Sequence, residues 1–125
     1  MGDHYFHDRL KGLIHEYVLL SYRLSKKYPA DEKYGLTSQD RRSSVSVMLN
    51  YVEGCARMRD AVKLNFYEIS FGSLKESIYC KYLALELDYI LDNDYKEAKK
   101  LEDEISAMLY TTLTGIRKKI NKIVP

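Results

Sequence analysis

The 125-residue chain has little that interrupts a helix, since it contains only two prolines and six glycines. It has no tryptophan, and its net charge of +2 is too small to indicate a nucleic-acid-binding protein by overall charge alone. Its 46% apolar and 30% charged residues are typical of a folded chain and argue against general disorder. The length predicts a single domain over residues 1–125, and the scarcity of helix breakers predicts long helices.

Long apolar runs are also missing. None approaches the roughly 20 residues that a membrane-spanning helix needs, and the start MGDHYFHDRLKG has charged residues and histidines where a signal peptide is apolar. Phe6 stands where a myristoylation motif has serine or threonine. The two cysteines, Cys55 and Cys80, form no disulfide framework, which is typical of a reducing compartment. We therefore predict a cytoplasmic protein with no membrane partner.

Apolar residues recur at helical spacing along four segments, and no alternating strand pattern competes with them. Pro29 ends the first segment, and Thr37 or Ser38 can cap the second, with Asp40 near its positive end. Asp94, with Glu97 three residues later, resembles a capping box before the fourth. The predicted helices cover residues of about 8–27, 38–57, 60–91 and 95–121. Short connections between them predict an all-α fold, an antiparallel up-down four-helix bundle.

The two middle segments have apolar residues on more than one side. In the segment 38–57, one side is formed by Val45, Met48, Leu49 and Val52, and another by Val47 and Tyr51. The segment 60–91 has a bulky stripe and a small-residue stripe, and Gly72 within it predicts that something packs very close. A monomeric bundle can absorb such wide arcs, because each helix touches two neighbours. The alternative that we favour is contact with a second subunit. The predicted interface residues are Val47, Tyr51, Phe71, Ile78 and Tyr82.

A polar seam runs between the two apolar sides of the segment 38–57. Its members are Gln39, Arg42, Ser46, Asn50 and Glu53, together with Glu76 of the next segment. A buried amide or carboxylate without a partner costs about 1–3 kcal/mol or more. We therefore expect the seam to be partly buried and internally hydrogen-bonded, with Glu53 paired to Arg57 one turn away. A catalytic pair of Glu53 and Glu76 is the alternative.

Few residues suit catalysis or metal binding. His4, His7 and His15 all lie near the start of the chain, and none follows a glutamate by three residues, as a carboxylate-bridged metal site in a bundle requires. His4 and His7, beside Asp8, could hold an adventitious metal, but we interpret this stretch as a mobile terminal segment. The cysteines have no histidine nearby in the sequence, which predicts packed thiols. No glycine-rich phosphate-binding loop is present in the sequence. We expect no enzymatic activity, no metal and no cofactor.

Basic residues cluster in the stretches YRLSKKY and RKKINK. Such patches neutralise phosphates, and their repetition around an oligomer would add up. The alternative is a solvated helix surface, where lysines complement the negative end of the helix dipole. The candidate nucleic-acid-binding residues are Arg23, Lys26, Lys27, Arg117, Lys118, Lys119 and Lys122.

The stretch YPADEKYGLTSQDRRSSVSVMLNYVEG, followed by FGSLKES, resembles the four-helix-bundle family of proteins encoded in 23S ribosomal RNA intervening sequences. The accessory proteins of diversity-generating retroelements are similar to this family. The resemblance covers residues of about 20–87. It rests on Pro29, Glu32, Gly35, Leu36, Gln39, Arg42, Ser46, Asn50, Glu53, Gly54, Gly72, Ser73 and Glu76. Met48 and Val52 depart from the proline and the small residue that are common there.

The resemblance implies a left-handed up-down bundle that assembles as a homo-oligomeric ring, typically a pentamer, without an established catalytic activity. For the retroelement relatives it implies a basic surface that binds RNA or DNA, with a reverse transcriptase as partner. We therefore expect a non-enzymatic interaction scaffold with a nucleic-acid-binding role. The alternative is a purely structural or partner-binding module. In either case Asn50 and Glu53 would set the register of the middle helices.

Overall fold

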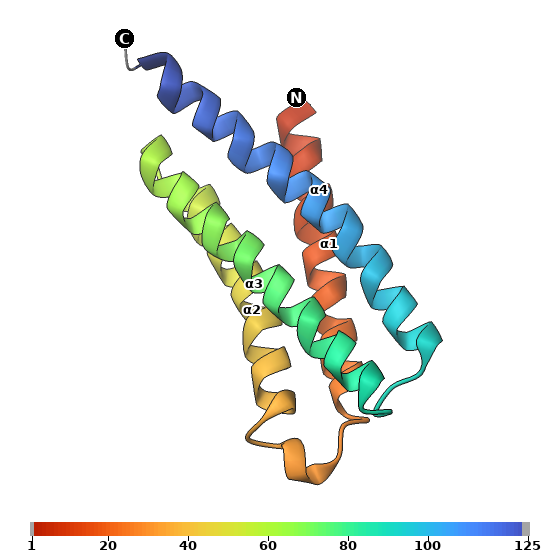
Figure 1. Cartoon of the computed structure of the whole chain (residues 1–125). Coiled ribbons are helices and arrows are strands. Elements are labelled where there is room, and N and C mark those ends of the chain that lie inside the picture. The colour runs from red at the N-terminus through yellow and green to blue at the C-terminus, as the bar shows by residue number, and fades with distance from the viewer. Residues whose placement is uncertain (1, 124–125) are drawn as a thin grey trace.

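The protein is an antiparallel bundle of four helices in a computed structural model that describes residues 2–123 (Figure 1). The helices are α1 (Gly2–Ser25), α2 (Leu36–Ala56), α3 (Asp60–Glu86) and α4 (Asp92–Ile123), and a 3-10 turn, η1 (Ala30–Glu32), precedes α2. Consecutive helices pack against each other, and α4 returns to pack against α1. The predicted all-α bundle is confirmed. Within the described range, no helix is both long and apolar enough to cross a membrane.

The first helix begins earlier than predicted. Residues 2–7 are already helical, and the Phe6 and His7 rings meet edge to face with their centroids 5.5 Å apart. His7 Nδ1 shares a hydrogen bond with the Tyr51 hydroxyl of α2. The interpretation of this stretch as a mobile segment is therefore wrong, because it is helical and its Phe6 and His7 side chains pack against the bundle.

The second helix is capped from a different position than predicted. Pro29 leads into η1, and this turn places Glu32 below the start of α2, where its Oε1 accepts a hydrogen bond from Leu36 N–H at 3.0 Å. Thr37 and Ser38 lie inside the first turn instead of before it. The predicted cap was wrong because a side chain four residues upstream satisfies the first backbone donor.

The third helix ends earlier than predicted, at Glu86, because Asp88 adopts a left-handed backbone with φ of 63°. Tyr89 N–H donates to Ala84 O at 2.8 Å and Asp88 N–H donates to Leu85 O at 3.0 Å, which is the hydrogen-bond pattern of a Schellman motif. The next helix therefore starts sooner, at Asp92.

Asp94 contributes to the start of α4, although not as the residue that precedes the helix. It lies in the first turn, where its Oδ2 accepts a hydrogen bond from Leu91 N–H at 3.0 Å. Glu97, the expected partner in a capping box, pairs instead with Arg23 of α1 at 2.9 Å. Asp94 therefore satisfies a backbone donor at the start of α4, but Glu97 connects α4 to α1 instead of completing the capping box.

The two stripes of α3 face two neighbours within the same chain. On the small-residue side, Ser70 Oγ donates to Val47 O of α2 at 2.7 Å, and Ser73 Oγ lies 2.8 Å from Ser46 Oγ. On the bulky side, Phe71 contacts Tyr110 of α4, with ring centroids 6.4 Å apart. The wide apolar arc of α3 is thus largely covered by α2 and α4 without a second subunit.

Three of the five predicted interface residues belong to the interior of the chain. Val47 and Tyr51 are almost completely buried, and Ile78 is 8% exposed. These residues lie in the core and cannot contact another copy, which corrects the prediction. Phe71 is half-buried, and Tyr82 is exposed. The close packing predicted at Gly72 is also wrong for the isolated chain, since no atom lies within 4 Å of the position that a Cβ would occupy.

Candidate functional site

The fold places the two predicted basic patches at opposite ends of the bundle. The α1 patch lies beside the start of α4, where Arg23 pairs with Glu97 and Lys27 with Asp94, both at 2.9 Å. The other patch begins at Arg117, twenty residues further along α4, which corresponds to roughly 30 Å of helix. The two patches therefore do not form one surface, and most of the charge of the α1 patch is balanced.

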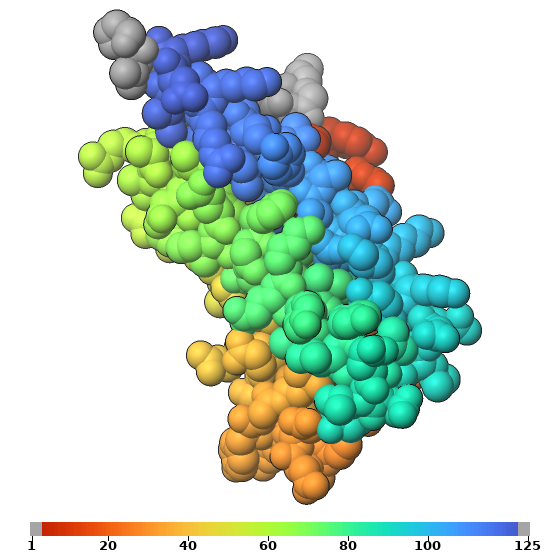
Figure 2. Space-filling model, in the orientation of Figure 1, coloured from red at the N-terminus to blue at the C-terminus, as the bar shows by residue number. Residues whose placement is uncertain are grey.

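Further cations join the second patch. Basic residues converge where α2 ends, α3 begins and α4 ends, and Figure 2 shows the last turns of α4 beside the first turns of α3. We call this cluster the basic end; it consists of Arg57, Arg59, Lys63, Arg117, Lys118, Lys119 and Lys122. The acidic residues in the same segments, 53–68 and 111–122, are Glu53, Asp60 and Glu68. The sequence prediction missed the first three cations because they are separated along the chain and only the fold brings them to α4.

Several cations of the basic end have no counterion. Arg57 pairs with Glu53 at 3.4 Å, as predicted, and Arg117 pairs with Glu68 of α3. Among residues 4–122, whose side chains the structure describes, no ion pair is formed by Arg59 or by the lysines at the end of α4, which are Lys118, Lys119 and Lys122. These side chains are all exposed. The basic end therefore presents positive charge that the chain itself does not neutralise.

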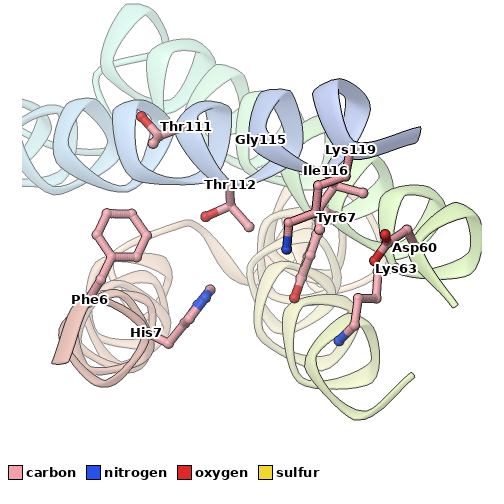
Figure 3. Close-up of a pocket in the computed structure, with 10 residues that line it drawn as sticks. All are labelled: Phe6, His7, Asp60, Lys63, Tyr67, Thr111, Thr112, Gly115, Ile116 and Lys119. Atoms are coloured by element: carbon pink, nitrogen blue, oxygen red, sulfur yellow. The ribbon is translucent and has the colours of Figure 1, made fainter. Parts of the chain in front are cut away.

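A cavity of about 480 Å³ opens at the basic end, between α1, α3 and α4 (Figure 3). His7, Tyr67, Thr112 and Lys119 point toward one another across it. The residues that line it are Phe6, His7, Asp60, Lys63, Tyr67, Thr111, Thr112, Gly115, Ile116 and Lys119. Sequence reasoning did not find this cavity, because its walls come from three helices and no local motif marks them.

On the side away from the cavity, the wall formed by α3 packs tightly against α2. A Cβ at Gly54 of α2 would lie only 2.6 Å from Cε1 of Tyr67, so glycine is what allows this ring to pack against α2. Lys63 turns away from the cavity centre and donates to the carbonyl oxygens of Gly54 and Cys55 at 3.1 and 3.2 Å. Burial raises the pKa of Tyr67 well above its usual value, so its hydroxyl stays neutral.

The most unexpected feature of the interior is a fully buried ion pair at the other end of the bundle. Lys81 Nζ of α3 lies 2.6 Å from Asp40 Oδ1 of α2, and neither side chain is exposed to solvent. Tyr28 OH donates to Asp40 Oδ2 at 2.6 Å, Ser77 Oγ donates to Oδ1 at 2.9 Å, and Tyr17 OH donates to Ser77 Oγ at 3.0 Å. The Asp40 carboxylate is therefore bound by two residues of α3 and by Tyr28 of the connection that follows α1.

This buried cluster has a structural role. Burial lowers the pKa of Lys81, and the adjacent Asp40 carboxylate opposes that shift. Because the groups are sealed from solvent, no substrate can reach them. The prediction that Asp40 acts on the dipole of α2 was wrong, because the side chain turns into the core toward Lys81, a residue hidden in the sequence among apolar neighbours.

The polar seam is partly buried and hydrogen-bonded, as expected. Asn50 Nδ2 donates to both Ser46 O and Ser46 Oγ at 2.9 Å, and Ser46 in turn contacts Ser73 of α3. Gln39 donates to Glu76, while Arg42 is exposed. Glu53 and Glu76 have different partners, Arg57 and Gln39, so the alternative of a carboxylate pair finds no support in their hydrogen bonding.

The cysteines and histidines provide no catalytic arrangement in the described part of the chain. Cys80 is buried, and burial raises its pKa to about 11. The expectation of a packed thiol is wrong for Cys55, which is exposed. Over residues 2–123, no group of three or more histidine, cysteine, aspartate or glutamate residues is arranged to hold a metal ion.

These features define a four-helix-bundle protein with a polar contact between its middle helices. The profile of the family described as "23S rRNA-intervening sequence protein" matches residues 12–111, and the chain belongs to this family. A crystal structure of a protein of unknown function from the S23 ribosomal protein family of Bacteroides thetaiotaomicron has the same fold. Its TM-score is 0.77 at 21% identity, and the match covers 83% of this chain and 97% of that one. No curated protein matches the chain.

Proposed function

We propose that this protein is a non-enzymatic scaffold that binds nucleic acid through its basic end and associates with copies of itself. The observation that carries the proposal is the convergence of unpaired cations from separate helices on one end of the bundle. Phosphates bound there would release condensed counterions, which favours binding at physiological salt. The family name, which refers to intervening sequences of 23S rRNA, makes RNA the first ligand to test. A reverse transcriptase partner stays a prediction from the resemblance.

Self-association is supported by apolar residues on the outer side of α2. Leu49 is 62% exposed and Val52 is 40% exposed, and neither is covered by the neighbouring helices. Ile69 and Leu83 of α3 and Leu87, which follows its last residue, are exposed as well. Apolar surface of this kind favours a protein partner, and a homo-oligomer such as the pentameric ring implied by the resemblance would cover it. We therefore propose this outer side as the interface between copies, in place of the buried residues that the sequence suggested.

Association would strengthen nucleic-acid binding. Each copy contributes one basic end, and several linked copies raise the effective concentration of cations around a single polynucleotide. A chain with a weak individual site would therefore bind tightly once assembled. This relation connects the apolar outer side of α2 with the charged end of the bundle.

The nucleic-acid proposal is tested by fluorescence anisotropy with labelled RNA over a range of salt concentrations. We expect the logarithm of the affinity to fall linearly with the logarithm of the salt concentration. The double variant Lys118→Glu/Lys122→Glu should bind at least tenfold more weakly, whereas Lys26→Glu/Lys33→Glu, with the same charge change at the other end, should bind nearly as the wild type. Absence of binding at low salt would instead favour the alternative of a purely structural or partner-binding module.

The association proposal is tested by light scattering at micromolar concentration. We expect the wild type to contain several copies and Leu49→Asp/Val52→Asp to contain fewer. Leu91→Asp is the matched control, because Leu91 is 72% exposed in the connection between α3 and α4. A wild type that is a stable single copy would contradict self-association.

A further inference from the structure

We propose that the cavity at the basic end receives an unpaired base of a single-stranded nucleic acid, an inference that rests on the nucleic-acid binding proposed above. Binding through phosphates alone would not distinguish one strand from two. The cavity adds a recess of about 480 Å³ in the middle of the cations. That volume lies within the roughly 300–1,000 Å³ that is typical of small-ligand sites and accommodates one base. A base within a duplex is stacked and paired and cannot enter, whereas an unpaired base can turn out of its strand.

The walls of the cavity have the chemistry that binds a base. Phe6 and His7 of α1 lie on one side, and Tyr67 of α3 and Ile116 of α4 lie on the other (Figure 3). Stacking on aromatic rings is the main source of sequence-tolerant affinity for single strands. Phe6 and His7 are half-buried and can offer ring faces to a base, whereas Tyr67 is only 3% exposed and closes the inner wall. Because the two rings of α1 belong to a helix that packs independently of any ligand, the surfaces for stacking exist before binding.

Polar groups inside the cavity can meet the edge of the base. The Thr112 hydroxyl donates to Met108 O at 2.9 Å, which leaves its oxygen to accept a hydrogen bond. His7 is oriented by the hydrogen bond between its Nδ1 and the Tyr51 hydroxyl, so Nε2 is the nitrogen that can face a ligand. The cavity therefore combines aromatic faces with a small number of fixed polar groups, as ligand sites do.

The lysines of α4 are divided between the cavity and the outer surface. Lys119 extends its amine into the cavity beside Tyr67 (Figure 3), where it can contact the phosphate or the face of the bound nucleotide. Lys118 and Lys122 lie about 100° and about 60° around the helix from Lys119, and neither of them lines the cavity. This arrangement suits a strand whose phosphates follow the outer lysines while one base turns inward.

The test compares a labelled single strand with a duplex of the same length and composition at constant salt. We expect the wild type to bind the single strand at least fivefold more tightly. The decisive variant is Gly115→Leu, because Gly115 lines the cavity and nothing lies within 4 Å of the position of an added Cβ, so a larger side chain has open space at its base. It should remove the preference for the single strand and leave duplex binding unchanged. Gly12→Leu, at another open position on α1, is the matched control and should retain the preference.

Two further variants separate stacking from charge. Phe6→Leu keeps the apolar volume and removes an aromatic face, so it should weaken single-strand binding roughly fivefold without an effect on the duplex. Lys119→Met should weaken single-strand binding more than duplex binding, whereas Lys118→Met, with the same loss of charge outside the cavity, should weaken both equally.

A strand in which 2-aminopurine replaces one base reports its entry into the cavity by a change in fluorescence, and circular dichroism verifies that each variant is folded. RNA and DNA strands are both measured, and the tighter of the two identifies the natural ligand.

The outcomes distinguish the two proposals. If single strand and duplex bind the wild type equally and Gly115→Leu changes neither affinity, the base-binding cavity is wrong, although the basic end still binds phosphates. If neither nucleic acid binds at low salt, the proposed function itself fails. If only the single strand is affected by Gly115→Leu and Phe6→Leu, both proposals are supported.

Discussion

At the end of the bundle that contains η1, several charged side chains form pairs between helices. Lys27 and Arg23 pair with acids of α4 on the surface, and Asp40 and Lys81 pair in the interior. At the basic end, by contrast, the exposed lysines of α4 have no counterion in the described chain, and a cavity lies among the helices. Paired charges at the first end connect helices to one another, whereas unpaired charges at the second are available to a ligand.

The two ends also differ in how strongly folding depends on their charged residues. The buried pair at the first end is satisfied through Tyr28, Ser77 and Tyr17, and every buried side-chain nitrogen or oxygen in the described part of the chain has a hydrogen-bond partner. Removing one member of such a network exposes the full desolvation cost of the others. At the basic end a lost lysine should change binding and leave folding nearly intact.

The largest expected effect is at the buried pair. Lys81→Met leaves the Asp40 carboxylate buried without a cation and should lower the free energy of unfolding by about 3–5 kcal/mol, measured by urea denaturation. The double variant Asp40→Asn/Lys81→Met removes both charges and should recover much of this loss. If the double variant is as unstable as the single one, the cost comes from lost packing and not from the unpaired charge.

A smaller loss of stability is expected from a substitution at Gly54, where α2 packs against the α3 wall of the cavity. Gly54→Ala places a Cβ 2.6 Å from Cε1 and 2.8 Å from Cδ1 of Tyr67, a ring that also packs against Tyr51. Overpacking of this kind should cost about 1–3 kcal/mol, measured by thermal unfolding. Gly12→Ala, at a position with open space, should not destabilise the protein. A neutral Gly54→Ala would show that the α3 wall of the cavity can move.

The basic end should also contain a site where stability can be gained. Gly115 lies within α4 and has open space around its Cβ position. Gly115→Ala should therefore raise the free energy of unfolding by about 0.5–1 kcal/mol, because alanine loses less backbone entropy in a helix. Denaturant titration measures the gain. A loss of stability would mean that the cavity around Gly115 is less open than its geometry indicates.

The smallest effect concerns the surface pairs of the first end. Partial burial would raise the pKa of Asp94, but Leu91 N–H and Lys27 more than compensate and hold this pKa below its usual value of 3.8. A carboxyl with a lowered folded-state pKa stabilises the protein above its unfolded-state pKa, and that contribution is lost as the pH falls through the folded-state value. Asp94→Asn should therefore cost a few tenths of a kcal/mol at pH 7. The stability curves of variant and wild type should converge as the pH falls below the folded-state pKa of Asp94, and curves that stay parallel would contradict this assignment.

Much of the architecture could be predicted from the sequence. Periodic apolar residues and few prolines or glycines identified four helices and an up-down bundle, because these signals act within one or two turns of the chain. The internal hydrogen bonding of the seam and the Glu53–Arg57 pair followed from the same local spacing. Helix ends were less accurate, since the Glu32 cap and the left-handed Asp88 depend on the geometry of the turns.

Only the tertiary structure decided which side of each helix faces a neighbour. Periodicity locates Val47 and Leu49 on different sides of α2, but it does not reveal that Val47 is in the core and Leu49 outside. It likewise cannot bring Lys63 of α3 to Lys119 of α4, or Lys81 to Asp40, because each pair is far apart in the chain. Side-chain spacing along a helix is a local property, whereas burial, charge pairing and cavities arise from the packing of helices that the local pattern alone does not orient.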